Sequence, residues 1–238
     1  MQSVQEYLQQ PGLAKFPFLF VVTYGRSGST LLVGLLNSLA GYHIRGENNG
    51  ALFLAFRATE RLRTARFHWG SKENSPEDPW YGAHLIAPDI FERGCVDAFF
   101  RAALRPPLGT RCCGFKEIRY TDAEMSEDEF TTYLDFISRL FPGAAFIFNF
   151  RDIEATARSG WWKTQDQEVV RRRLHNACQR MLTYAENRPD KTYSFNYDTL
   201  LQEVTHFAGL CNFLGEAFDE RAASAVISKQ HSVIAGKR

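Results

Sequence analysis

The stretch Phe18-Leu-Phe-Val-Val-Thr-Tyr-Gly-Arg-Ser-Gly-Ser-Thr30 decides the fold of this 238-residue chain. Its first six residues are apolar or β-branched, which is typical of a strand buried on both faces of a parallel sheet. Leucines then recur at helical spacing from Leu31 to Leu39, which predicts an amphipathic helix. The stretch therefore predicts a strand, a tight polar loop and a helix in direct succession.

The loop of this unit has the composition of an anion-binding site. Its glycines let the backbone turn sharply and approach a ligand, and the following helix points free N–H groups and its positive dipole end at the loop. The hydroxyls add donors, and Arg26 adds a fixed positive charge. A plain strand-to-helix turn capped by serine is the alternative, but the buried strand and the arginine favour an anion site. The predicted site consists of Gly25, Arg26, Ser27, Gly28, Ser29 and Thr30.

Strands and helices alternate along the rest of the chain. Further strands are predicted at 111–118, 145–150 and 193–197, with a short extended piece at 42–44. Helices are predicted at 49–66, 88–104, 126–141 and 166–187, followed by two more. The helix at 88–104 is expected to turn inward Phe91, Val96, Phe99, Phe100 and Ala103. This alternation predicts an α/β fold: a three-layer sandwich with a mostly parallel, P-loop-like central sheet.

Length and composition indicate one domain spanning residues 1–238. Residues 67–88 have no clear period and are expected to form an excursion that binds the acceptor. The net charge of +1 does not predict nucleic-acid binding. No secretory signal or membrane-spanning run is recognised, and five scattered cysteines favour a cytoplasmic protein. The oligomeric state is not indicated.

The loop departs from the nucleoside-triphosphate motif GxxxxGK[ST], because Gly25 lies only three residues before Gly28 and no lysine follows. The segment Thr23–Leu32 instead resembles the 5′-phosphosulfate loop of sulfotransferases, with Arg26 at the position of the family's basic residue. A second signature of that family is an arginine at a strand end and a serine eight residues later. Arg151 and Ser159 match it.

A softer match is Asn196-Tyr-Asp-Thr-Leu200, which resembles the family segment beside the adenine and would place Tyr197 there; an ordinary strand end is the alternative. The resemblance extends from about Phe18 to at least Ser159. The C-terminal Ala235-Gly-Lys-Arg238 does not match the basic segment that closes the 3′-phosphate site in the cytosolic branch.

The resemblance implies sulfuryl transfer from 3′-phosphoadenosine 5′-phosphosulfate (PAPS) to a hydroxyl or amine of a small-molecule or glycan acceptor. Arg26 would stabilise the leaving group, and no metal is expected. Lys116 lies at the end of a predicted strand, where ligands collect in a parallel sheet, so it could touch the sulfonate; an exposed ion-pair ladder is the alternative. Glu47 is the first candidate for the general base, although a helix-capping role is the alternative. The other candidate bases are His43, His68 and Glu117.

Two other functions remain open at this point. One is a P-loop kinase acting on a nucleotide or small molecule, which would share the strand, loop and helix. The other is a non-catalytic nucleotide-binding protein that keeps the anion site without the chemistry. The absence of a loop lysine counts against the kinase.

Overall fold

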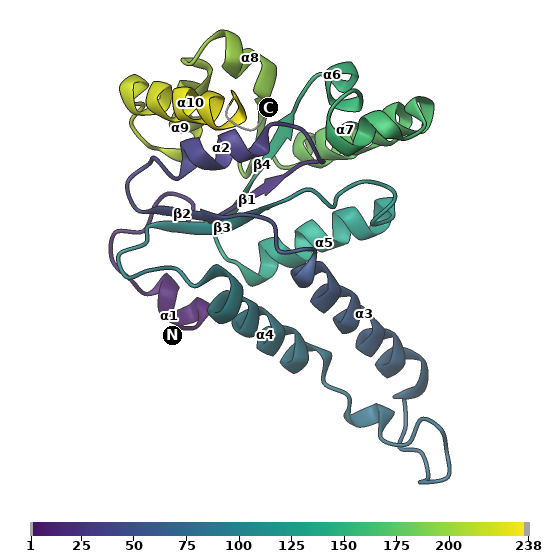
Figure 1. Cartoon of the computed structure of the whole chain (residues 1–238). Helices are drawn as coiled ribbons and strands as arrows, with labels where there is room; N and C mark the ends of the chain where they lie inside the picture. Colours follow the sequence, from purple (N-terminus) through teal and green to yellow (C-terminus); the bar gives the residue numbers. More distant parts are fainter. Residues whose placement is uncertain (1, 236–238) are drawn as a thin grey trace. The chain divides into compact units, whose positions relative to one another are not determined.

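A computed structural model of the chain describes residues 2–235. Contacts divide them into two compact units. The smaller unit contains the residues up to Tyr7 together with Gly50–Arg105, and the larger contains Leu8–Asn49 and the chain from Pro106 onward. The sheet and both predicted anion-binding motifs belong to the larger unit (Figure 1). Of the C-terminal segment considered above, residues 236–238 lie outside the described residues.

The sheet has five strands in the order β2-β3-β1-β4-β5, and all neighbours run parallel. The predicted mostly parallel sheet is therefore confirmed. In its register Val22 stands opposite Glu117 and Phe148, so the segments that follow β1, β3 and β4 leave from the same edge. The strand bounds are β1 Phe18–Val22, β2 Tyr42–Arg45, β3 Cys112–Glu117, β4 Ala144–Phe150 and β5 Thr192–Asn196.

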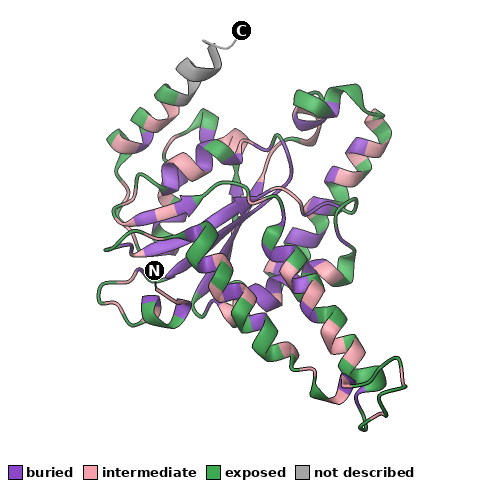
Figure 2. Ribbon diagram, turned by 60° about the horizontal axis from the view of Figure 1, so that its bottom comes forward, coloured by how far each residue is buried: buried purple, intermediate pink, exposed green. Residues whose placement is uncertain are grey.

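Helices cover both faces of this sheet, which gives the three predicted layers (Figures 1 and 2). Alternate strand residues point to opposite faces. Leu19 and Val21 join the core cluster beneath α2 (Ser29–Leu36), α8 (Tyr197–Gln202), α9 (His206–Leu214) and α10 (Glu220–Ala235). Phe18 and Phe20 pack edge-on against Phe141, at the end of α5 (Glu127–Leu140). On the same face α7 (Gln167–Glu186) contributes Tyr184.

The start of α5 follows from its sequence. The Ser126 hydroxyl accepts a hydrogen bond from the backbone N–H of Glu129 at 3.2 Å, and the Glu129 carboxylate accepts one from the N–H of Ser126 at 3.0 Å. This reciprocal pair is a capping box, which satisfies two backbone donors that the first helical turn leaves free. The prediction of a helix start at this serine is confirmed.

The smaller unit is helical. It contains most of α1 (Val4–Leu8), α3 (Ala51–Trp69), the 3-10 turn η1 (Ala83–Leu85), α4 (Pro88–Phe99) and the π-helical turn η2 (Phe100–Leu104). Arg63 joins α3 to α4 by ion pairs to Asp89 at 2.9 Å and to Glu92 at 2.7 Å. None of the described helices is both long and apolar enough to cross a membrane.

Two of the predicted inward positions on the helix at 88–104 are wrong, because Phe91 and Ala103 are exposed. Glu92 is buried instead, since Arg63 pairs with its carboxylate. The π-helical turn changes the register after Phe99, and Leu104 is buried where regular helical spacing would favour Ala103.

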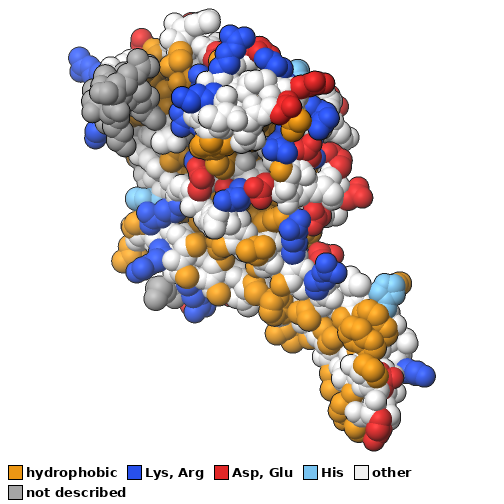
Figure 3. All heavy atoms as spheres, turned by 45° about the vertical axis from the view of Figure 1, so that its right-hand side comes forward, with side chains coloured by type: hydrophobic (Ala, Val, Ile, Leu, Met, Phe, Trp, Pro, Cys, Tyr) orange, Lys and Arg blue, Asp and Glu red, His pale blue; other side chains and the backbone are white. Residues whose placement is uncertain are grey.

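Residues 67–88 belong wholly to the smaller unit. They begin in the last turn of α3 and pass through turns and η1 before α4. Trp69 and Trp80 stack with ring centroids 3.6 Å apart and planes within 2°. Phe67, Tyr81 and Leu85 of this segment are exposed. Figure 3 shows exposed hydrophobic side chains gathered at this end of the unit. Binding of the acceptor by this segment stays a prediction.

Candidate active site

The loop between β1 and α2 is fastened to the end of β4. The Thr23 hydroxyl donates to the carbonyl of Asn149 at 2.7 Å, and the Asn149 amide donates to the carbonyl of Ser27 at 2.9 Å. Arg26 adopts φ 69°, and Gly28, which caps α2, adopts φ 79°. A left-handed backbone conformation is costly for any residue other than glycine. The surrounding contacts therefore impose this backbone conformation on Arg26, whose side chain is exposed.

Several buried polar atoms of this loop region have no partner among the described residues. They are the Ser27 hydroxyl, the Arg151 Nε and the Asn149 Oδ1. A buried polar group without a hydrogen bond is costly, which makes an unmet donor in a loop an indication of a ligand. A hydroxyl and a guanidinium N–H are suited to phosphate or sulfate oxygens, so Ser27 and Arg151 fit an anionic ligand.

The two sequence motifs meet at Arg26. Its Nε donates to the Ser159 hydroxyl at 3.3 Å, and the Arg151 guanidinium donates to the Arg26 carbonyl at 2.8 Å. Tyr24 supports the same arrangement, because its hydroxyl donates to the Arg151 carbonyl at 3.0 Å and accepts from the Arg151 N–H at 3.1 Å. Burial raises the pKa of Tyr24 far above its usual value, so the phenol keeps the proton that it donates.

The third predicted segment lies on the same loop. The ring of Tyr197 packs against Gly28 so closely that a Cβ at this glycine would overlap it. The Arg151 guanidinium lies over that ring, 5.1 Å from its centroid. The adjacent Asp198 accepts a hydrogen bond from the N–H of Asp152 at 2.6 Å. Residues from the ends of β1, β4 and β5 are thus brought together.

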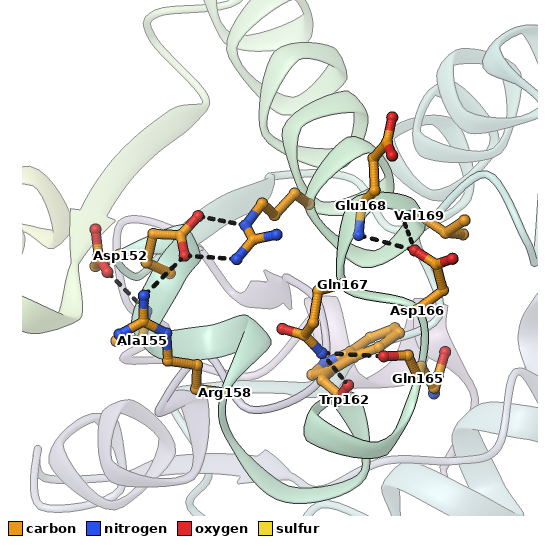
Figure 4. A network of polar contacts seen from close by, with 11 residues as sticks. Asp152, Ala155, Arg158, Trp162, Gln165, Asp166, Gln167, Glu168 and Val169 are labelled. Atoms are coloured by element: carbon orange, nitrogen blue, oxygen red, sulfur yellow. Dashed lines mark hydrogen bonds and ion pairs between the residues drawn. The ribbon is translucent and has the colours of Figure 1, made fainter.

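A pair of tryptophans encloses the other side of the loop. The Trp162 indole donates to the Gly25 carbonyl at 2.9 Å, and the Trp161 ring contacts Gly25 where a Cβ would otherwise stand. They belong to η3 (Gly160–Thr164), which follows α6 (Ile153–Ala157). Figure 4 shows how the next turn is fixed: the Gln167 amide donates to the Trp162 carbonyl at 2.9 Å, beside the aspartate that caps α7.

A cavity of about 350 Å³ opens beside the loop in the larger unit. Its wall combines the two tryptophans with charged and hydroxyl side chains from the segment that follows β3. It is lined by Gly25, Glu47, Ile118, Arg119, Thr121, Glu124, Trp161 and Trp162. Thr121 and Glu124 were missed by the sequence interpretation, although their place just after a central strand of a parallel sheet is the signal that could have found them.

Glu47 lies at this cavity and forms an ion pair with Lys116. The lysine side chain is 7% exposed and the glutamate 45%, so the cation is buried while the carboxylate reaches solvent. Lys116 therefore contacts the candidate base, a partner that the sequence did not indicate. No described group of three or more His, Cys, Asp or Glu residues could hold a metal ion.

The other candidate bases lie differently. The Glu117 carboxylate is buried and accepts from the N–H groups of Asn48, at 3.2 Å, and Ile118, at 2.8 Å. His43 lies inside β2, paired in register with Cys113, and β2 ends at Arg45. Glu47 therefore lies beyond the end of this strand. His68 belongs to the smaller unit.

The loop, held between a buried strand and a helix at one edge of a parallel sheet, defines a P-loop-like α/β protein. The sequence profile described as "Sulfotransferase family" matches residues 17–220, and the chain belongs to that family.

Two solved structures are similar. Sulfotransferase STF9 from Mycobacterium avium is 12% identical with a TM-score of 0.44, and the match covers 96% of this chain and 70% of that one. A sulfotransferase from Alicyclobacillus acidocaldarius is 14% identical with a TM-score of 0.48, covering 84% of this chain and 81% of that one. No curated protein sequence matches the chain.

Proposed function

We propose that this sulfotransferase uses PAPS as donor and transfers its sulfuryl group to a hydroxyl or amine of a small-molecule or glycan acceptor. One observation carries the proposal: Arg26 of the loop and Ser159 of the second motif are hydrogen-bonded at 3.3 Å. A donor with a 5′-phosphosulfate and a 3′-phosphate needs two anion sites close together. These two motifs would supply them.

The loop residues would bind the 5′-phosphosulfate end. The N–H groups at the start of α2 and the Ser27 hydroxyl, which is buried without a partner among the described residues, are suited to its oxygens. Arg26 would neutralise the negative charge that develops on the leaving phosphate. Arg151 and Ser159 would hold the 3′-phosphate, and Tyr197 would face the adenine.

Glu47 would act as the general base. In the reaction the acceptor oxygen or nitrogen attacks sulfur, the bond from sulfur to the leaving phosphate oxygen breaks, and the acceptor proton passes to the carboxylate. Glu47 suits this role because its carboxylate is partly exposed at the cavity beside Gly25. The pair with Lys116 fixes the orientation of that carboxylate.

The cavity would receive the acceptor. One side presents the indole of Trp161, which is 48% exposed, and the rest carries the Thr121 hydroxyl and the ion pair between Arg119 and Glu124 at 3.0 Å. An aromatic ring face suits the apolar face of a ring-shaped ligand, and the polar groups suit hydroxyls around its rim. A sugar combines both features.

Transfer of ³⁵S-labelled sulfate from PAPS tests the proposal. The acceptors are methyl β-D-glucopyranoside, N-acetylglucosamine, 4-nitrophenol and tyramine, which sample sugars, a phenol and an amine. Labelled product with at least one of them supports the function. If none is labelled, and ATP with Mg²⁺ stabilises the protein against heat while 3′-phosphoadenosine 5′-phosphate does not, the proposed donor is wrong.

A further inference from the structure

One face of α7 is bonded to the segment that connects β3 to α5. Arg173, Asn176 and Arg180 occupy positions i, i+3 and i+7 and therefore share a side of the helix. Arg173 Nε and the Asn176 amide both contact the Asp122 carboxylate at 3.2 Å. The helix thus contacts the connecting segment through three side chains in succession.

Arg180 makes the deepest of these contacts. Its side chain is 4% exposed, and its guanidinium donates to the Met125 carbonyl at 3.2 Å and forms an ion pair with Glu127 at 3.1 Å. The guanidinium also lies over the Phe130 ring, 5.4 Å from the centroid. A buried charge is tolerated only when such partners compensate it, so the arginine fixes the carbonyl and carboxylate that it contacts.

The same connecting segment forms part of the cavity beside the loop. Ile118, Arg119, Thr121 and Glu124 line the cavity, and Asp122 lies among them in the chain. Thr121 directly precedes the residue that Arg173 and Asn176 bind. A movement of this segment away from α7 would displace the cavity wall while leaving the contacts between Arg26, Arg151 and Ser159 intact.

We propose that Arg173, Asn176 and Arg180 are positioning residues that hold residues 118–126 as the wall of the acceptor site. The acceptor role of the cavity rests on the proposed function. Because α7 acts on the wall, weakening these contacts raises the KM for the acceptor and leaves the affinity for the donor product, 3′-phosphoadenosine 5′-phosphate, unchanged.

The test compares Asp122→Ala with Asp135→Ala. Asp135 of α5 is a matched control, because it also accepts from two side chains, Tyr184 at 2.9 Å and Arg188 at 2.9 Å, and is comparably exposed. It does not line the cavity. Hydrogen–deuterium exchange of residues 118–126 is measured on the protein without ligand. Exchange should rise by up to about fivefold in Asp122→Ala only, as expected for the loss of a partly exposed pair.

The KM for whichever of the four acceptors is sulfated best should rise by a similar factor in Asp122→Ala, with little change in kcat. Arg180→Lys, which keeps the charge, should show the same pattern. Equal exchange in the two aspartate variants would overturn the assignment to α7. The same holds if Asp122→Ala weakens the affinity for 3′-phosphoadenosine 5′-phosphate as much as it raises the KM for the acceptor. If no acceptor is sulfated, and ATP with Mg²⁺ stabilises the protein against heat while 3′-phosphoadenosine 5′-phosphate does not, the proposed function fails, while the exchange comparison still decides whether α7 holds the segment.

Discussion

Arg26 and Ser159 are hydrogen-bonded across 133 residues of sequence, and this contact joins the loop after β1 to the turn after α6. Arg151 reinforces the junction by donating to the Arg26 carbonyl. The guanidinium groups of Arg26 and Arg151 and the hydroxyl of Ser159 therefore lie at one loop. The buried Ser27 hydroxyl of the same loop has no partner among the described residues. The proposed role in donor binding and the predictions below depend on this arrangement.

Replacement of Arg26 should affect the chemical step most. Arg26→Ala removes the charge that would stabilise the leaving phosphate, so kcat for sulfate transfer should fall by about a hundredfold to a thousandfold. Arg26→Lys keeps the charge but loses the Nε contact to Ser159 and should retain part of the activity. Transfer of labelled sulfate measures both variants. Near-normal turnover in Arg26→Ala would assign the stabilising cation to another residue.

Gly28→Ala should impair donor binding for a steric reason. The new Cβ would overlap the Tyr197 ring, and the backbone at φ 79° already disfavours a side chain. Gly109→Ala is the matched control, because Gly109 has φ 78° with no atom near enough to meet a Cβ. Both should lose about 1–2 kcal/mol of unfolding free energy from backbone strain, measured by urea denaturation. Only Gly28→Ala should also weaken binding of 3′-phosphoadenosine 5′-phosphate; equal binding by the two variants would contradict this.

Glu47→Gln tests the general base. The amide keeps the size of the side chain but cannot take up the acceptor proton, so kcat should fall strongly while affinity for 3′-phosphoadenosine 5′-phosphate stays unchanged. Glu124→Gln is the matched control, since it alters another carboxylate of the same cavity. Rates of labelled sulfate transfer distinguish them. Normal turnover in Glu47→Gln together with an inactive Glu117→Gln or His43→Ala variant would place the base elsewhere.

His206 should make stability depend on pH. Its Nε2 accepts from the N–H of Asn196 at 3.3 Å, next to Tyr197, and burial lowers its pKa below 6.5. The unfolded chain therefore binds the proton at a higher pH than the folded protein does. The contribution of His206 to the free energy of unfolding is therefore fully present above about pH 6.5. It is lost as the pH falls through the lower pKa of the folded protein. Urea denaturation from pH 7.5 to 5.5 should show a shallower decrease in His206→Gln; an identical decrease would contradict the assignment.

The patterns that are local in sequence predicted the structure well. The apolar run before Thr23 became β1, and the reciprocal capping pair at Ser126 opened α5. The spacing of Arg151 and Ser159 could be recognised because a stretch of nine residues contains both ends of the motif. In each case the interactions that determine the element lie within a few turns of backbone, so a single sequence contains them.

The contacts between distant residues could not be predicted. The pair of Lys116 with Glu47 spans 69 residues, and the bond from Trp162 to Gly25 spans 137. Such contacts depend on the strand order and on how each loop leaves the sheet, which periodicity does not encode. The π-helical turn after Phe99 could not be predicted from periodicity either. It altered which side of the helix Ala103 faces.

The central claim is that the contact region of Arg26, Arg151 and Ser159 binds a 3′-phosphorylated sulfuryl donor. Isothermal titration calorimetry of 3′-phosphoadenosine 5′-phosphate and adenosine 5′-phosphosulfate, with the wild type and with Arg151→Ala, tests it most directly. The account predicts tighter binding of the 3′-phosphorylated ligand by the wild type and loss of that preference in Arg151→Ala, since the variant removes a charge-assisted contact to the 3′-phosphate. Equal affinity of the wild type for both ligands, or an equal weakening of both in the variant, would contradict it.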